Sequence, residues 1–534
     1  MGNQILARMT IEQKIGQLVM ATLPGTVVND AVASHLRDGQ YGGVVLFSRN
    51  IVSVEQTRAM TAAIHEICTL DGLPPLIGVD QEGGRVRRLM PEATATPSAM
   101  ALGATGDAAL VERVGAAVGR ELRALGINTD FAPVADVNNN PRNPVIGTRS
   151  FGESPERVGA MVVAFADGLR VAGVAATAKH FPGHGDTHVD SHLDLPTIPH
   201  DLDRLRAVEL APFAAAIDAG VPLVMTSHIR FPALEPDGLP ATLSRRILHD
   251  LLRDEMGFDG VVITDAMVMH AIDDTYGIVA GSVRAIIAGN DLVEPLLHES
   301  AVVAGLLEAV SDGRLPMAQV DASVRRILRL KRWLAEQPAV ALDVVGAHRP
   351  LVQEAAEASV TLLDARPGAL PLASDASIAV IEFALQSAHA AEEGQSAPTP
   401  VCDAFGQRFA HVQGIALDAT TPAADAIAAA RSLASGADML VIATRDANLF
   451  SAQMAAIDAL RATDRATIFV SLRAPYDLAD FPWAAARIAT YGDLPASLDV
   501  AAAICAGALP PRGCLPVSVG PLFPVGYGRT ALPL

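Results

Sequence analysis

The protein is a chain of 534 residues with 40 lysines and arginines against 59 aspartates and glutamates, which gives a formal charge of −19 with neutral histidines. Half of its residues are hydrophobic and 19% are charged, a composition typical of globular proteins rather than disordered or fibrous ones. The acidic balance argues against nucleic acid or an anionic membrane as a partner. No stretch approaches the roughly 18 uncharged apolar residues of a spanning helix.

In the first 335 residues, short apolar runs alternate with long amphipathic stretches, which indicates repeated strand and helix units around a parallel sheet. The apolar runs predict strands over residues 43–47, 76–80, 129–134, 175–179, 223–227 and 260–265. Periodicity predicts helices over 108–125, 155–171, 202–219 and 244–256. We therefore expect an α/β fold that begins with a TIM-like (β/α)8 barrel over residues 1–337.

A second series of strands and helices follows a segment over 338–350, which we interpret as a linker. Short strands are expected over 359–363, 378–383, 439–444, 467–472 and 486–491, separated by alanine-rich helices. The tract 386–400 lacks periodicity and is expected to be an exposed loop. Residues 351–534 are thus predicted to form a smaller α/β (αβα) sandwich domain.

Polar residues end most of the predicted barrel strands. Asp80, Asp136, Lys179 with His180, His228 and Asp265 all follow apolar runs. The carboxyl ends of barrel strands face the active site, so these side chains are expected to converge on one pocket. The pattern indicates an enzyme.

The segment 179–192 has the highest density of reactive side chains. His180, His184, His188 and His192 recur every four residues, but Pro182 and two glycines exclude a helix and predict a loop. A metal site using these histidines with Asp186 or Asp190 is an alternative that we rank below a metal-free one. A single residue separates Asp190 from His192, so the carboxylate is placed to orient the imidazole for general acid/base catalysis.

Three further candidates lie near the expected mouth of the barrel. Asp265 ends a long apolar run and is an N-cap, an ion-pair partner or a reactive group. Asp80 and Arg88 flank a glycine-rich turn, where they reach the mouth or pair with each other. Arg149 offers a planar guanidinium to a carbonyl or hydroxyl group.

Several motifs together resemble those of glycoside hydrolase family 3, in its bacterial β-N-acetylglucosaminidase branch. They are VDQEGGRVRR at 79–88, DFAPVADV at 130–137, GTRSFG at 147–152, KHFPGHGDTHVDSH at 179–192, MTSHIRFPAL at 225–234 and GFDGVVITDAMVM at 257–269. The second domain resembles the carboxyl-terminal sandwich of longer members. The resemblance implies the barrel and sandwich fold, no metal or cofactor, and a small carbohydrate as substrate.

The resemblance also assigns roles to individual residues. It implies that Asp265 is the nucleophile and that Asp190 and His192 form the acid/base pair of a retaining double displacement. The substrate contacts that it implies are Asp80, Arg88, Arg149, Lys179 and His180, with His228 near the same mouth and Met267 beneath the sugar.

This branch releases terminal β-linked N-acetylglucosamine, which suggests muropeptide fragments of peptidoglycan as substrates. Phosphorolysis by the same residues, β-glucosidase specificity, a metal-dependent hydrolase and a non-catalytic carbohydrate-binding protein stay open as alternatives. The first residues lack the pattern of a secretory signal, which predicts a cytoplasmic protein. The sequence leaves open whether the protein is a monomer or a homodimer.

Overall fold

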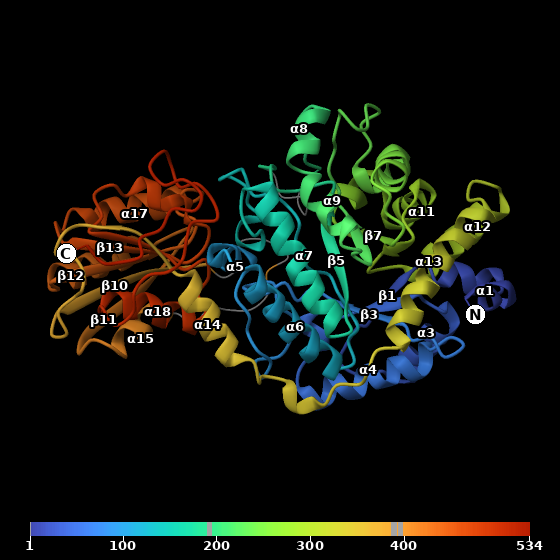
Figure 1. Ribbon diagram of the computed structural model, residues 1–534, viewed down its shortest axis with the longest axis horizontal. Coiled ribbons are helices and arrows are strands. Elements are labelled where there is room, and N and C mark those ends of the chain that lie inside the picture. Colours follow the sequence, from blue (N-terminus) through green and yellow to red (C-terminus); the bar gives the residue numbers. More distant parts are fainter. Residues whose placement is uncertain (1, 189–194, 386–391, 393–398, 534) are drawn as a thin grey trace.

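The computed structural model describes residues 2–188, 195–385, 392 and 399–533. It contains a barrel domain and a second, smaller α/β domain, drawn in blue to yellow-green and in orange to red in Figure 1. Helix α14 (Arg349–Ser359) lies between them. The described residues form no helix that combines the length and the apolar character required to cross a membrane.

Eight parallel strands form the barrel in sequential order. They are β1 (Met20–Thr22), β2 (Gly43–Val45), β3 (Leu76–Val79), β4 (Thr129–Asp130), β5 (Ala175–Phe181), β6 (Leu223–Thr226), β7 (Val261–Ala266) and β8 (Leu292–Glu294). A parallel bridge between Val19 and Val293 joins the first strand to the last. The predicted barrel is therefore confirmed, and the two strands that the sequence did not reveal, β1 and β8, have only three residues each.

Helices surround the barrel strands. They are α1 (Gly2–Arg8), α2 (Ile11–Gly16), α3 (Asp30–Gly39), α4 (Val54–Cys68), α5 (Ala99–Thr105), α6 (Ala108–Ala124), α7 (Pro155–Val171), α8 (Leu202–Ala207), α9 (Ala211–Asp218), α10 (His270–Tyr276), α11 (Ile278–Ala288), α12 (Glu299–Ser311) and α13 (Met317–Ala335), with a π-helix, η4 (Arg246–Glu255). The single helix expected over 202–219 is instead two helices. Pro212 explains the break, because proline lacks an N–H and clashes with the carbonyl four residues earlier.

The adjacent helices α6 and α7 pack very closely because glycines face each other at their contact. A Cβ atom on Gly115 would lie 2.5 Å from the carbonyl oxygen of Phe165, and one on Gly168 would lie 2.2 Å from that of Glu112. Side chains also cap both helices, since Asp107 accepts from the Leu110 N–H and Ser154 accepts from the Arg157 N–H. These local features fix the positions of the neighbouring strands β4 and β5.

The second domain contains a six-stranded sheet in the order β11-β10-β12-β13-β14-β9. Its strands are β9 (Thr361–Ala365), β10 (Ser377–Ala384), β11 (His411–Asp418), β12 (Met439–Thr444), β13 (Ala466–Ser471) and β14 (Ala486–Ala489), and its helices are α15 (Pro400–Gly406), α16 (Ala424–Ser435), α17 (Ser451–Arg461) and α18 (Pro495–Cys505). Only β9 runs antiparallel to its neighbour. The predicted second α/β domain is confirmed, and the unpredicted β11 is a largely exposed edge strand.

The two domains share a packed and hydrogen-bonded interface. Met100 and Ala104 of α5 belong to the hydrophobic core of the second domain. The Asn138 amide donates to the Tyr476 hydroxyl at 2.8 Å, and that hydroxyl donates to the Asn138 carbonyl at 3.0 Å. The second domain thus supports the loops that follow β3 and β4, at the carboxyl end of the barrel.

Candidate active site

Side chains from the carboxyl ends of the barrel strands line a cavity of about 300 Å³. The residues that the sequence analysis selected and that line it are Asp80, Arg88, Arg149, Lys179, His180 and Asp265. They come from four separate parts of the chain: the loop after β3, the turn η2 (Gly147–Arg149), β5 and β7. The expected convergence of strand ends therefore occurs.

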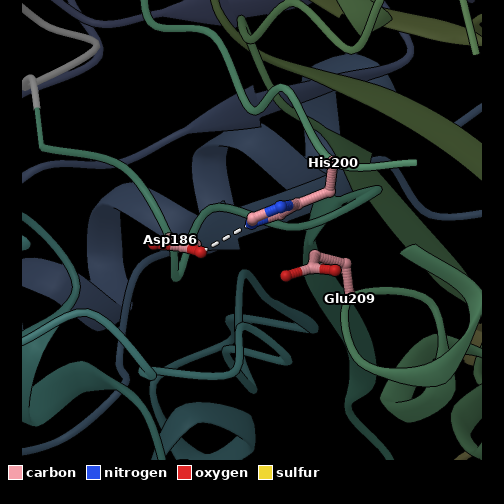
Figure 2. Close-up of side chains that lie close together, drawn as sticks. All are labelled: Asp186, His200 and Glu209. Carbon is pink, nitrogen blue, oxygen red and sulfur yellow. Dashed lines mark hydrogen bonds and ion pairs between the residues drawn. The ribbon is translucent and has the colours of Figure 1, made fainter. Parts of the chain in front are cut away.

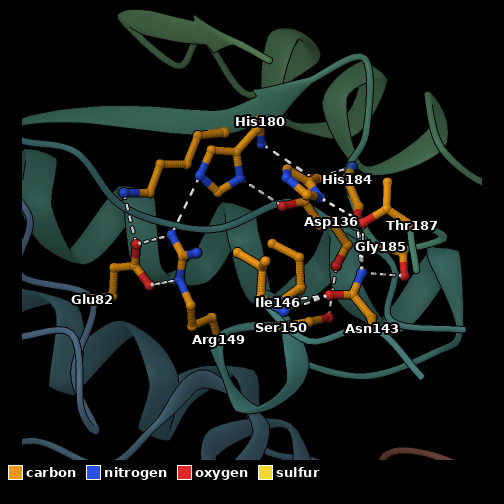
Figure 3. A network of polar contacts seen from close by, with 12 residues as sticks. Glu82, Asp136, Asn143, Ile146, Arg149, Ser150, His180, His184, Gly185 and Thr187 are labelled. Atoms are coloured by element: carbon orange, nitrogen blue, oxygen red, sulfur yellow. Dashed lines mark hydrogen bonds and ion pairs between the residues drawn. The ribbon is translucent and has the colours of Figure 1, made fainter. Parts of the chain in front are cut away.

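Glu82 joins two buried cations, Arg149 and Lys179, that line the cavity, and Figure 3 shows its contact with Arg149. Arg149 donates from Nε and Nη2 to the two oxygens of Glu82, at 2.8 and 2.7 Å, and Lys179 Nζ lies 2.7 Å from Glu82 Oε1. Burial alone would raise the pKa of Glu82, but Arg149 and Lys179 together hold it below its ordinary value. Burial opposes the charged form of both cations as well, yet the neighbouring carboxylates raise their pKa values. All three groups are therefore charged at neutral pH.

Asp80 provides a second carboxylate beside this group. Lys179 Nζ donates to its Oδ1 at 2.7 Å, and Arg88 Nη2 lies 3.9 Å from its Oδ2. The Asp80 side chain keeps 21% of its surface exposed, against 2% for Lys179. It therefore presents a fixed acceptor to a hydroxyl group that enters the cavity.

The imidazole of His180 is held from both sides. Its Nδ1 lies 2.7 Å from Oδ2 of the buried Asp136, and its Nε2 lies 3.3 Å from Arg149 Nη2 (Figure 3). Because arginine only donates, this arrangement leaves Nε2 as the acceptor and places a proton on Nδ1, which faces the carboxylate. Asp136 also accepts from the backbone N–H of His184 at 2.7 Å, so it orients the start of the following loop.

The loop after β5 is shaped by a buried amide, that of Asn143. The amide nitrogen donates to the carbonyl groups of His184 and Gly185 at 2.9 and 2.8 Å (Figure 3). A side chain at Gly185 would lie 1.8 Å from the Val137 carbonyl oxygen, so only glycine fits there. Burial, together with His180, lowers the pKa of His184 to about 4, and the ring is neutral at pH 7. Of the loop predicted over residues 179–192, residues 182–188 form neither helix nor strand, residues 179–181 belong to β5, and residues 189–192 lie outside the described residues.

Asp190 and His192, the predicted acid/base pair, lie outside the described residues. Asp265 lies within β7, and its Oδ1 accepts from the backbone N–H of Ala266 at 2.8 Å. The next helix, α10, begins five residues later, so Asp265 does not cap it. Of the explanations considered for this carboxylate, an N-cap is therefore excluded.

His228 and Met267 are placed differently from the other selected residues. His228 is 1% exposed, donates from Nε2 to the Ala266 carbonyl at 3.1 Å and bonds through Nδ1 to the Thr242 hydroxyl at 2.7 Å. It therefore supports the end of β7 through its hydrogen bond to the Ala266 carbonyl. Met267 follows the end of β7 at Ala266, where the chain turns, and its side chain is completely buried in the barrel core, so its position beneath a sugar stays a prediction.

Asp186, His200 and Glu209 lie close enough together to hold a metal ion (Figure 2). However, His200 Nε2 is 2.7 Å from Asp186 Oδ2, and Arg204 Nη1 donates to Glu209 Oε2 at 2.5 Å. A second nitrogen of Arg204 lies 4.0 Å from Asp186. The guanidinium thus places a positive charge between the two carboxylates, and we interpret the group as an ion-pair network.

Two residues of the cavity region, Glu82 and Glu294, were not selected from the sequence, and the contacts of a third, Asp136, were not anticipated. Glu82 follows Asp80 in the same glycine-rich turn, and Asp136 was recognised only as a strand end. The local sequence gives no indication that either pairs with a residue more than 40 positions away. Glu294 also lines the cavity, and it was missed because β8 is too short to be predicted.

The model of the glycosyl hydrolase family 3 N-terminal domain matches residues 10–330. Beta-hexosaminidase A of Pseudoalteromonas piscicida is 35% identical over 500 residues, which cover 84% of this chain and 83% of that protein. A protein of Cellulomonas fimi named beta-N-acetylglucosaminidase/beta-glucosidase is 31% identical over 549 residues and covers 96% of this chain and 94% of its own length.

Among solved structures, a glycoside hydrolase family 3 beta-N-acetylglucosaminidase from a Paenibacillus species superposes with a TM-score of 0.89 at 37% identity. The match covers 96% of this chain and 99% of that one, so both domains correspond. The resemblance noted in the sequence is confirmed over nearly the whole length. This chain belongs to glycosyl hydrolase family 3.

Proposed function

We propose that this protein is a retaining β-N-acetylhexosaminidase that releases terminal β-linked N-acetylglucosamine. The observation that carries the proposal is the cavity itself, which Asp265 lines together with Arg149 and Lys179, the two cations that Glu82 joins. The names of relatives that match over more than four fifths of the chain support the choice of sugar.

In the first step of the proposed reaction, the carboxylate of Asp265 attacks the anomeric carbon, and His192, oriented by Asp190, protonates the departing oxygen. In the second step, the same histidine removes a proton from water, which attacks the anomeric carbon and releases Asp265. The configuration at that carbon is retained because it is inverted twice.

The fixed charges of the cavity are suited to holding a neutral sugar. In this proposal Asp80 accepts from a sugar hydroxyl, while Arg88, Lys179 and His180 form the rest of the polar wall. Arg149 is already bonded to Glu82 and His180, so its main contribution is to fix their positions. Rigid polar groups of this kind stabilise a transition state without reorganising.

We further propose muropeptide fragments of peptidoglycan as the natural source of the sugar, a choice that rests on the family resemblance. The test is release of N-acetylglucosamine from a disaccharide muropeptide, compared with release from a chitin disaccharide. A much higher kcat/KM on the chitin disaccharide would contradict the choice of peptidoglycan.

The chemistry is tested with 4-nitrophenyl N-acetyl-β-glucosaminide beside the corresponding β-glucoside. We expect the wild type to prefer the N-acetyl sugar and Asp265→Asn to lose the activity. Asp273→Asn, at an exposed carboxylate on α10, is the matched control and should keep it. Activity on both sugars that survives in Asp265→Asn would contradict the proposed nucleophile.

Two additions to the same assay separate the alternatives. Excess phosphate should produce no sugar 1-phosphate if water is the acceptor, and a chelator should leave the rate unchanged. His192→Ala should lower the hydrolytic activity about 10²- to 10⁴-fold on a substrate with a poor leaving group, and much less on a substrate with a good leaving group. Equal losses with both leaving groups would exclude His192 as the acid.

A further inference from the structure

Glu294, the last residue of β8, places a carboxyl group in the same cavity as Asp265 and Asp80. Its backbone is fixed against β7, because its carbonyl accepts from the Met267 N–H at 2.9 Å and its N–H donates to the Thr264 hydroxyl at 3.0 Å. The residue beside it in the register of β7 is Ala266, which directly follows Asp265. Glu294 is therefore held next to the proposed nucleophile.

The carboxyl group is almost completely enclosed. Glu294 is 4% exposed, and its Oε1 has no hydrogen-bond partner among the described residues. A buried carboxyl oxygen without a partner is costly, and such groups in native proteins usually meet a ligand or a bound water. The side chains of Asp80, Glu82, Arg149 and Lys179, by contrast, are joined to one another.

The protonation state of Glu294 follows from its surroundings. Burial raises its pKa well above the ordinary value, and the like charges of Asp80 and Asp265 raise it further, while Lys179 opposes the shift. A neutral carboxyl group offers one O–H donor. It also adds no negative charge beside Asp265, so it does not favour protonation of the nucleophile.

We propose that Glu294 is a substrate-contact residue, whose carboxyl group donates a hydrogen bond to an oxygen of the sugar bound beside Asp265. The inference rests on the proposed function of the cavity as a sugar site. Hydroxyl and amide oxygens of a glycosyl unit are acceptors, and the enclosed donor would discriminate against a sugar that lacks the matching oxygen. The contact would form in the bound sugar as well as in the transition state.

Two variants of Glu294 test the contact. Glu294→Gln keeps the shape and a neutral donor, and we expect its kcat/KM on the aryl N-acetylglucosaminide to stay within about threefold of the wild type. Glu294→Met keeps the volume and removes the donor, and we expect a loss of about 10- to 100-fold, since it leaves a sugar oxygen without its partner. The melting temperature of Glu294→Met should be unchanged or higher, because an unpartnered polar group has been removed.

Glu299→Gln is the matched control. Glu299 is also a buried carboxyl group near β8, but it accepts from the N–H and hydroxyl of Thr22, at 3.1 and 2.8 Å, and it does not line the cavity. This change should lower the melting temperature and leave kcat and KM as they are. A structural effect is thereby distinguished from loss of a substrate contact.

Wild-type kinetics in Glu294→Met would overturn the proposal. Equal losses in Glu294→Gln and Glu294→Met, with unchanged melting temperatures, would also overturn it, because they would show that an ionised carboxylate is required. Calorimetric titration with N-acetylglucosamine separates this inference from the proposed hydrolysis. If the wild type is inactive but binds the sugar more tightly than Glu294→Met does, the proposed hydrolysis is wrong and the Glu294 contact stands. If the wild type is inactive and the two proteins bind the sugar equally, both proposals are wrong.

Discussion

Arg149 and Glu82 form a two-point ion pair, at 2.8 and 2.7 Å, although 67 residues separate them in the chain. Lys179 joins the same carboxylate and also binds Asp80. Two cations and two anions therefore balance within this group, which forms one wall of the cavity. The ion pairs keep each of these four groups ionised. The group as a whole has no net charge, which suits a site proposed for an uncharged sugar.

Replacing Glu82 by glutamine should be severely destabilising. It leaves Arg149 and Lys179 buried without their shared anion, and breaking a buried pair in this way costs about 3–5 kcal/mol. We expect a decrease of that size in the free energy of unfolding from urea denaturation at pH 7. Because the pKa of Glu82 is lowered in the fold, this stabilisation is present above its ordinary pKa of 4.5 and is lost as the pH falls below it.

The control for that measurement is Glu354→Gln. Glu354 also forms a two-point pair, with Arg113 at 2.8 and 2.6 Å, but both side chains are about half exposed. Exposed pairs contribute little because water and salt screen them, so this variant should unfold close to the wild type. Similar losses in both variants would show that burial of the Glu82 pair does not determine its contribution.

Arg149→Lys should impair catalysis while preserving the charge. A lysine cannot bond both oxygens of Glu82 and also reach His180 Nε2, because it lacks the planar arrangement of donors. We expect kcat/KM to fall about 10- to 100-fold, the effect of losing a hydrogen bond to a charged group. Steady-state kinetics with the aryl N-acetylglucosaminide provide the measurement. Arg113→Lys is the control. An equal fall in kcat/KM in that variant would show that the loss in Arg149→Lys does not come from its contacts with Glu82 and His180.

Much of the barrel mouth could be predicted from the sequence, because neighbouring residues in the chain are enough to identify where each buried strand ends. Apolar runs that end in Asp80, Lys179 or Asp265 mark the carboxyl ends of buried strands, and a parallel barrel brings such ends together. The same reasoning failed at β8, where three residues are too few to show a periodicity, and Glu294 was missed with it.

Pairing between distant residues could not be predicted in this way. Nothing near Glu82 in the sequence identifies Arg149 as its partner, and nothing near Asp136 identifies His180. The complete burial of Met267 was not predicted either, because it depends on where β7 ends. The chain changes direction after Ala266 and packs the Met267 side chain in the barrel core.

Tyr476→Phe should weaken the interface between the domains. The hydroxyl both accepts from the Asn138 amide and donates to the Asn138 carbonyl, and removing it leaves buried polar atoms without partners. We expect a loss of about 1–3 kcal/mol in the free energy of unfolding. The control is Tyr276→Phe, where the ring lies against Arg284 within the barrel domain. Equal stability of the two variants by calorimetry would contradict a role for the Tyr476 hydroxyl.

Lys331→Met should stabilise the protein at neutral pH. Lys331 lies in α13 with no exposed surface, and its Nζ donates to Gln17 Oε1 at 2.6 Å. Burial lowers its pKa from 10.5 to about 7. Between these values the unfolded chain binds a proton that the folded chain does not, so the wild type loses stability as the pH falls from 10.5 toward 7. Below pH 7 both states bind the proton and the loss stays constant.

A methionine carries no proton, so the gain in unfolding free energy of Lys331→Met over the wild type should be largest at or below pH 7 and should shrink toward pH 10. Urea denaturation at pH 6.5, 8 and 9.5 measures this trend. Lys14→Met is the control, because Lys14 pairs with the partly exposed Asp321 at 2.8 Å. Lys14→Met removes an ion pair, whereas Lys331→Met removes a buried amine that is bonded to a neutral amide, so the control should not stabilise the protein. A gain for Lys331→Met that does not vary with pH would mean that packing, and not the proton, determines the effect.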